Sequence, residues 1–174
     1  MAMQTREQHI RREKANSNIC TSQVLLAVMS VFYATYHGPV GLKRIANRIH
    51  RLTALTAAAL KAKGFAINNL SFFDTLTVNV GDNQRAIYNA ALAAEINLRL
   101  VGNDSLGISL NETTSATDLE KLLAVFGVAG LELSSLDEQI RDGKNITANN
   151  AIPGDLRRTD AVLTHPVFNT YHSE

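Results

Sequence analysis

The amino-acid sequence predicts an α+β fold, in which long helices pack on a small, mainly antiparallel sheet and an irregular tail ends the chain. Two helical patterns meet at Gly38-Pro39, and a segment with alternating apolar and polar residues, Asp74 to Val80, follows them. Further on, two short apolar runs at 97–101 and 106–110 are joined by the turn residues 102–104. This connection is too short for a crossover helix, so the two runs should pair antiparallel.

The first predicted helix begins at a cap, Asn18 or Thr21, and runs to His37. Gly38 permits a left-handed stop and Pro39 suits the first turn of a following helix, so together they mark a boundary. The apolar residues of this helix surround almost its whole circumference, which predicts that it is covered on most sides. They are Val24, Leu25, Val28, Met29, Val31, Phe32 and Tyr36.

The second predicted helix extends from Pro39 to Lys63 and is closed by Gly64. Its apolar face consists of Leu42, Ile45, Ile49, Leu52 and Ala59, and its opposite face carries Lys43, Arg44, Arg48 and Arg51. Such a basic face can contact a phosphate, but basic residues opposite an apolar stripe are usually solvated helix surface. We favour the solvated surface.

The remaining elements form the sheet and its helices. They are a half-buried strand from Asp74 to Val80, where the sheet is expected to begin, a helix from Asn83 to Ile96, strands from Asn97 to Val101 and from Leu106 to Leu110, and a helix from Thr117 to Phe126. The last helix should be capped by Ser115 or Thr117 and stopped by Gly127.

The sequence suggests three segments along the chain. Residues 1–17 are polar and charged and resemble a connector that packs on a surface elsewhere. Residues 18–143 hold the helical and strand patterns of one α+β domain. From Lys144 to Glu174 the hydrophobic periodicity fades, which predicts an irregular tail that is extended or docked.

Composition excludes several classes of protein. The 174 residues are 45% apolar and 19% charged, with a formal net charge of +1, which favours a globular protein over a disordered or nucleic-acid-binding one. Cys20 is the single cysteine, so an intrachain disulfide is excluded, and residues 1–14 do not resemble a secretory signal. The apolar run from Val24 to Tyr36 is shorter than the ~20 residues of a membrane span. These observations predict no membrane role and a location in the cytoplasm or an organelle matrix.

The sequence shows no recognisable catalytic, cofactor-binding or metal-binding constellation. The histidines have no metal-ligand spacing, and glycine-rich dinucleotide, P-loop and hydrolase motifs are absent. The lysines, at positions 14, 43, 61, 63, 121 and 144, do not follow a strand and precede a glycine-rich phosphate loop, so no Schiff-base lysine is predicted.

The sequence allows two roles for each of two residues. The thiol of Cys20, near a helix start and basic residues, could be an activated nucleophile, but we favour a small core side chain. His165 precedes Pro166 and should therefore lie in extended backbone, either as an anchor for the tail or as a pocket residue. We favour the anchor.

The residues also resemble a known family. The run from Thr5 to Thr21 closely resembles a signature segment of the glycine-cleavage P-protein. The similarity continues, over nearly the whole chain, through Tyr36 to Pro39, Gly41 to Ala46, Phe73 to Thr75, Ala94 to Arg99, Leu106 to Thr114 and Leu163 to Asn169. P-proteins of this type are long chains of two homologous halves, each similar to the large and small domains of aspartate aminotransferase.

The resemblance implies that this chain is the end of the first half. Residues 1–17 would leave the missing large domain, residues 18–143 would form the small domain, and residues 144–174 would lead toward the second half. The family, also called glycine dehydrogenase (aminomethyl-transferring), decarboxylates glycine with pyridoxal phosphate and passes the aminomethyl group to the lipoyl arm of H-protein.

The resemblance also locates the family's Schiff-base lysine in the second half, outside this chain. We therefore expect no pyridoxal phosphate bound to this chain and no activity from it alone. The alternative function is a non-catalytic structural or docking module that shapes the active-site cleft and the interface between the halves. The expected partners are the remainder of the P-protein and lipoylated H-protein.

The apolar helix from Val24 to Tyr36 carries a further expectation about assembly. It presents more apolar surface than the chain itself can cover, so the isolated chain is expected to form a homodimer through helix faces. The competing arrangement is a monomer in which Leu156, Val162 and Phe168 of the tail cover the helix.

Overall fold

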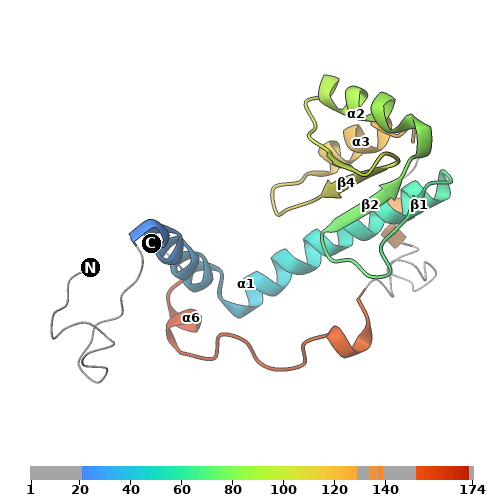
Figure 1. Ribbon diagram of the computed structural model, residues 1–174. Helices are drawn as coiled ribbons and strands as arrows, with labels where there is room; N and C mark the ends of the chain where they lie inside the picture. Colours follow the sequence, from blue (N-terminus) through green and yellow to red (C-terminus); the bar gives the residue numbers. More distant parts are fainter. Residues whose placement is uncertain (1–20, 129–133, 136, 139–151, 173–174) are drawn as a thin grey trace, which may run out of the picture. The chain divides into compact units, whose positions relative to one another are not determined.

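The computed structural model describes residues 21–128, 134–135, 137–138 and 152–172 (Figure 1). The chain divides into two compact units, one formed by Met1–Leu42 and Ala161–Glu174 and the other by Lys43–Asp160. The sequence-based expectations for the connector at 1–17 and for Cys20 fall outside the described residues. The overall α+β class is confirmed, with one long helix, a small antiparallel sheet and shorter helices.

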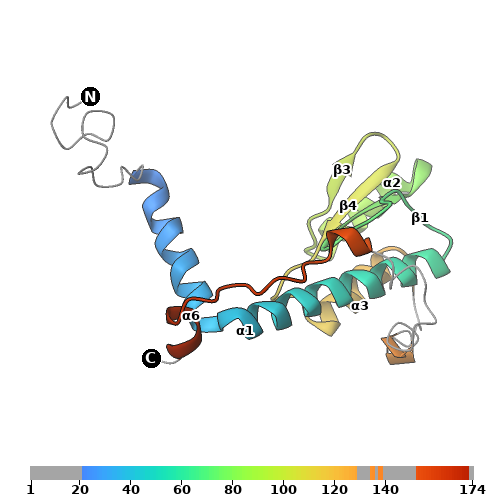
Figure 2. The same ribbon diagram turned by 90° about the horizontal axis from the view of Figure 1, so that it is seen from below.

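Helix α1 (Thr21–Ala62), labelled in Figure 2, contains both helices that the sequence predicts, joined at a kink at Gly38. Gly38 lies at the kink with φ of 60° and ψ of −178°, a backbone region that is essentially restricted to glycine. Pro39 follows it as the first residue of the second helical stretch, where its missing N–H costs no helical hydrogen bond. The predicted boundary at Gly38-Pro39 is confirmed.

The stretch from Thr53 to Leu60 of α1 is buried on every side. Four of its residues are alanines, and the two threonine hydroxyls donate to carbonyl oxygens one turn back, Thr53 to Ile49 at 3.0 Å and Thr56 to Leu52 at 2.8 Å. The small side chains let neighbouring elements approach closely, and the hydroxyls bury no unpaired polar group. The expected single apolar stripe is therefore wrong for this stretch, because it has no exposed face.

The end of α1 follows the predicted glycine stop. Gly64 has φ of 100°, and the N–H of Phe65 donates to the carbonyl of Leu60 at 3.0 Å. This backbone bond satisfies a carbonyl that the helix itself leaves free.

A four-stranded antiparallel sheet lies in the second unit, in the order β1-β2-β4-β3. Its strands are β1 (Ala66–Ile67), β2 (Thr75–Asn79), β3 (Arg99–Val101) and β4 (Ser105–Ser109). The predicted antiparallel pair β3 and β4 is confirmed, with Leu100 opposite Leu106. The expectation that the sheet begins near Asp74 is wrong, because the two-residue β1 precedes it and pairs with β2.

Two helices accompany the sheet and lie next to each other in Figure 1. Helix α2 (Gln84–Ala93) follows the 3₁₀ turn η1 (Gly81–Asn83), and it ends before the predicted Ile96 because Glu95 adopts a left-handed φ of 61°. The buried amide of Gln84 donates to the carbonyl of Ser105 at 2.7 Å, which joins the start of α2 to β4.

Helix α3 (Ala116–Val125) begins at Ser115, one of the two caps that the sequence allows. The Ser115 hydroxyl accepts from the N–H of Asp118, and the Asp118 carboxylate accepts from the Ser115 N–H at 2.9 Å and from its hydroxyl at 2.6 Å. This reciprocal capping box satisfies backbone donors that the helix cannot pair. Gly127 stops the helix with φ of 70°, as predicted.

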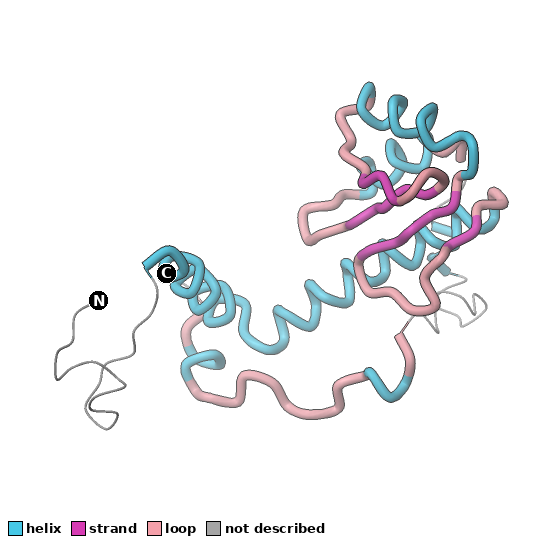
Figure 3. The backbone as a smooth tube through the Cα atoms, in the orientation of Figure 1, coloured by secondary structure: helices cyan, strands magenta, loops and turns pink. Residues whose placement is uncertain are grey.

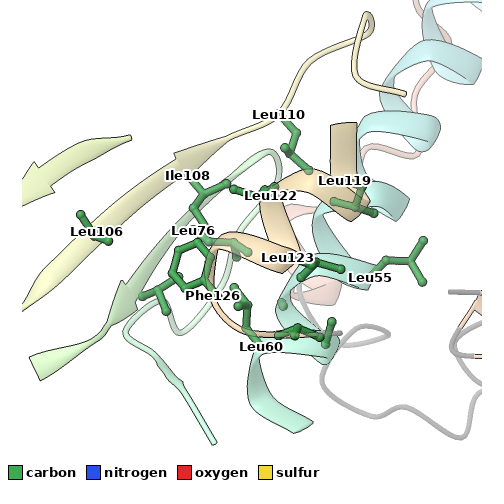
Figure 4. Close-up of a cluster of buried hydrophobic side chains, with 14 of the residues drawn as sticks. Leu55, Leu60, Leu76, Leu106, Ile108, Leu110, Leu119, Leu122, Leu123 and Phe126 are labelled. Carbon is green, nitrogen blue, oxygen red and sulfur yellow. The ribbon is translucent and has the colours of Figure 1, made fainter. Parts of the chain in front are cut away.

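One face of the sheet meets α1 and α3 in the hydrophobic core (Figure 4). The paired residues Leu76 and Ile108 of β2 and β4 are 0% and 2% exposed. The close-up shows them beside the leucines of α3, with Leu55 and Leu60 contributed by α1. The two helices supply Leu55, Leu60, Leu119, Leu122 and Leu123, and Phe126 follows directly after α3.

The described part of the C-terminal tail has little regular structure, as Figure 3 shows. It contains only the 3₁₀ turn η2 (Gly154–Leu156) and the short helix α6 (Val167–Thr170). Over residues 152–172 this agrees with the irregular tail that the sequence predicts.

The core predicts that alanine substitutions at two leucines differ greatly in their effect on the free energy of unfolding. Leu76 is 0% exposed and Leu70, in the loop before β2, is 103% exposed. Leu76→Ala should lower the free energy of unfolding by about 2–5 kcal/mol, because it leaves a cavity, and Leu70→Ala should change it by less than about 0.5 kcal/mol. Urea denaturation of the two variants measures this. Equal losses would contradict the described core.

The capping box predicts a pH-dependent stability. Hydrogen bonds from the Ser115 side chain and backbone hold the pKa of Asp118 below its usual value. A carboxylate whose pKa is lowered in the folded state stabilises that state at pH values above its unfolded pKa of about 3.9. This stabilisation is lost as the pH falls through the lower pKa of the folded state. The wild-type chain should therefore be more stable than Asp118→Asn at pH 6, and the difference should shrink below about pH 3.9. Urea titrations at pH 6 and pH 3 check this, and a difference that grows in acid would refute it.

Candidate functional site

The N-terminal part of α1 carries an exposed apolar surface. We define the α1 apolar surface as the side chains of Leu25, Leu26, Val28, Met29, Val31, Phe32, Tyr33, Tyr36 and Val40. Leu25 is 73% exposed and Phe32 is 71% exposed. The described residues thus leave uncovered the helix that the sequence predicts to be covered.

By length and composition, the stretch Gln23–Ala62 of α1 passes a simple test for a membrane span. Core helices of soluble proteins pass the same test, so this property alone is weak evidence for a membrane role.

The end of the tail contacts α1 at the kink. The ring Nδ1 of His172 lies 3.0 Å from the carbonyl oxygen of Tyr36, to which it donates. A Cβ at position 38 would lie 2.6 Å from His172 Cε1 and 2.8 Å from the Phe168 carbonyl oxygen. Glycine is therefore required at position 38 by its backbone conformation and by this close approach. We call the contact of residues 168–172 with Tyr36 and Gly38 the tail clasp.

His165 organises the turn that leads into the clasp. Its Nδ1 accepts from the N–H of Val167 at 3.2 Å, and its carbonyl accepts from the Asn169 side chain at 3.1 Å. The same Asn169 amide donates to the carbonyl of Leu163 at 2.9 Å. These bonds all lie within residues 163–169, so His165 shapes the turn of the tail, and its role as an anchor stays a prediction.

Aromatic rings gather just before the kink. The ring of His37 lies 4.4 Å from that of Tyr33 and 5.2 Å from that of Tyr36, both in edge-to-face arrangements. Such contacts favour a fixed orientation of the last helical turn.

Two arginines of the basic face hold neighbouring loops. Arg48 donates to the carbonyls of Glu112 at 2.8 Å and Thr114 at 2.7 Å, and Arg51 forms a two-bond ion pair with Asp137. The hydrogen bond to Asp137 is the main cause that raises the pKa of Arg51. The expectation of a merely solvated face is wrong for these two, because their guanidinium groups bind protein oxygens.

His50 has a structural environment as well. Its Nδ1 lies 3.0 Å from the carbonyl oxygen of Phe73, and its ring stacks on the Phe73 ring at 5.5 Å. Sequence reasoning missed this contact, since the two residues are separated by a helix end and a strand.

Within the described ranges, no group of three or more His, Cys, Asp or Glu side chains could hold a metal ion. The lysines among these residues, Lys43, Lys61, Lys63 and Lys121, are all exposed and lie on or directly after helices. The arrangement defines a packing module of α+β class, with an uncovered helix and a clasped kink as its distinctive features.

Comparisons with known proteins identify the family of this module. The family sequence profile described as "Glycine cleavage system P-protein" matches residues 1–126. The chain therefore belongs to the glycine cleavage system P-protein family.

Its relatives include bacterial enzymes named glycine dehydrogenase (decarboxylating). The protein of Shewanella halifaxensis is 61% identical over 181 residues, that of Vibrio parahaemolyticus is 55% identical over 174, and that of Stutzerimonas stutzeri is 56% identical over 176. Each match covers 100% of this chain and 18% of the relative. The chain thus spans about a fifth of the length of the curated relatives that it matches.

Solved structures are also similar to the chain, and one of them illustrates the extent of the match. This example is a crystal structure of glycine decarboxylase (P-protein) of the glycine cleavage system in an inhibitor-bound form, at 27% identity and a TM-score of 0.48. The match covers 79% of this chain and 31% of that chain.

The tail clasp predicts that alanine at position 38 destabilises the chain more than alanine at another glycine with positive φ. Gly38→Ala places a methyl group against the tail in addition to the cost of its positive φ, whereas Gly81→Ala, with φ of 56° and no atom within 4 Å, carries only the backbone cost. Gly81→Ala should cost about 1–2 kcal/mol. Gly38→Ala should cost more and should accelerate amide hydrogen exchange at residues 168–169. Unchanged exchange there, with equal costs for the two variants, would show that the clasp does not form.

Proposed function

We propose that this chain is a structural part of a glycine dehydrogenase (decarboxylating), the P-protein of the glycine cleavage system. The observation that carries the proposal is identity of 55–61% to enzymes of that name across the whole chain. The complete enzyme would decarboxylate glycine and transfer the aminomethyl group to the lipoyl arm of H-protein, with the remainder of the P-protein and H-protein as partners.

The described residues do not fit a pyridoxal phosphate site. The cofactor needs a lysine for its Schiff base, and a phosphate cradle such as a glycine-rich loop at a helix start. The four described lysines are exposed at helices, and the N-termini of α2 and α3 follow the 3₁₀ turn η1 and the Ser115 cap, not such a loop. We therefore assign no catalytic, cofactor-binding or metal-binding role to any of the residues that the structure describes.

The contribution of the chain is then architectural. We propose that residues 18–143 form the small domain of an aspartate-aminotransferase-like half, that residues 1–17 lead into it from a large domain, and that residues 144–174 lead onward. The fixed arginine contacts and the tail clasp support such a role, because both hold connecting segments in defined places. The bacterial relatives support a cytoplasmic location.

A docking module is the second candidate function. The exposed α1 apolar surface favours it, because a contiguous apolar patch is unusual on a protein that acts alone. The two candidates are compatible, since a structural part of a larger enzyme must also dock onto the rest of it.

Activity measurements on two proteins test the proposal. The isolated chain should neither exchange labelled carbon dioxide into glycine nor hold pyridoxal phosphate stoichiometrically on one lysine after borohydride reduction. A chimera of the Shewanella halifaxensis enzyme, with its matching segment replaced by this chain, should retain the exchange, and deletion of the segment should abolish it. Exchange by the isolated chain, or an inactive but soluble chimera, would reject the proposed role.

A further inference from the structure

The α1 apolar surface is the largest unexplained feature of the described residues. Met29 at its centre is 65% exposed, and Leu26 beside it is 64% exposed. No Asp, Glu, Lys or Arg occurs between Gln23 and Leu42, so the surface has no charged residue to keep it hydrated. Contiguous apolar patches of this kind mark binding surfaces more often than free ones.

The tail does not cover this surface. Phe168 and Val162 are half-buried, and the tail clasp lies at Tyr36 and Gly38, at the end of this helical stretch. Tyr36 itself remains 58% exposed, and Leu25, more than two turns earlier in the helix, is 73% exposed. The occupant of the surface must therefore come from outside the described part of the chain.

We propose that the α1 apolar surface is the docking site for P-protein polypeptide that lies beyond these 174 residues. The inference rests on the proposed function. The relatives that match the whole chain have more than four-fifths of their length outside the matched segment, since the match covers 18% of each. Polypeptide in the same molecule has a high effective concentration at the surface, which favours it over a separate partner.

A lipid bilayer fits the surface poorly. The helical stretch from Thr21 to the kink is roughly 25 Å long at 1.5 Å per residue, shorter than the ~30 Å of a hydrocarbon core. The tail clasp places the imidazole of His172 on the backbone of Tyr36, at the end of that stretch. Membrane insertion would carry these polar groups to the hydrocarbon or break the clasp.

A second copy of the chain can cover the surface only if two separate chains associate, and that association depends on the protein concentration. Two isolated chains would bury it against each other at high concentration, as the sequence leads us to expect. In a longer P-protein chain, the covalently continuous polypeptide competes with that encounter at every concentration. The two occupants therefore predict different behaviour on dilution: a second copy would leave the α1 apolar surface as the protein concentration falls, and covalently continuous polypeptide would stay on it.

Met29 is a natural probe of the surface, because hydrogen peroxide converts an exposed methionine to its sulfoxide. We would measure Met29 oxidation by peptide mass spectrometry in the isolated chain at low concentration and in the chimera with the Shewanella halifaxensis enzyme. N-acetylmethionine amide in the same solution gives the reference rate. Leu70→Met in the isolated chain, at a position that is 103% exposed, gives the matched protein control.

Docking predicts that Met29 of the isolated chain reacts about as fast as the residue 70 control, whereas Met29 of the chimera reacts at least about tenfold more slowly. Leu25→Ala with Phe32→Ala should speed Met29 oxidation severalfold in the chimera and leave it unchanged in the isolated chain. Alanine maintains the helix, so faster oxidation of Met29 in the chimera alone reports that the docked polypeptide no longer covers Met29, and not that the helix has unfolded.

Three outcomes would overturn the inference. Met29 in the chimera could react as fast as in the isolated chain. Its protection could disappear on dilution together with a halving of the sedimenting mass, which would assign the surface to a second copy. Protection could also arise only on addition of phosphatidylethanolamine and phosphatidylglycerol vesicles, which would assign it to lipid. A chimera that exchanges carbon dioxide while Met29 stays reactive rejects docking alone, and an inactive chimera with a protected Met29 rejects the proposed function alone.

Discussion

The burial of one short stretch of helix is the constraint on which the second unit depends. Thr53 to Leu60 of α1 has no exposed residue, so every neighbouring element must approach it closely. Alanine makes that approach possible, and the threonine hydroxyls remove the polar cost by bonding within the helix. The paired leucine, valine and isoleucine side chains of β2 and β4 and the leucine face of α3 then complete one core. The capping box and the Arg48 contacts hold the loop that carries α3 into that core.

The same helix has two parts with opposite relations to solvent. Before Gly38 its large apolar side chains are exposed, and after Lys43 its small ones become enclosed. Hydrophobicity read along the sequence suggests the reverse, because the stretch with the largest apolar residues should be the most buried. For a segment of a longer protein this difference has a physical meaning. A surface whose cover lies in another part of the polypeptide keeps its apolar composition.

Local signals predicted most of the elements correctly. Gly38-Pro39, Gly64, Gly127 and the Ser115 cap act through the backbone of their own neighbourhood, so their positions can be read directly. Strand β1 was missed because two residues cannot show a period, and it forms only by pairing with β2. The end of α2 was missed because the left-handed residue there is Glu95, not glycine. Arg48 and Arg51 were misread because their partners, over sixty residues away, are known only from the fold. The family itself could be recognised from the sequence, whereas the tail clasp depends on a contact between distant segments.

The order of the sheet has a consequence for how this chain behaves when it is made without its neighbours. The two shortest strands, β1 and β3, lie at the two edges, and the longer β2 and β4 are paired on both sides. Edges of two and three residues offer few free backbone groups for another strand to extend. Amyloid-like growth through the sheet is thereby discouraged, and any aggregate of the chain should keep a helical infrared signature.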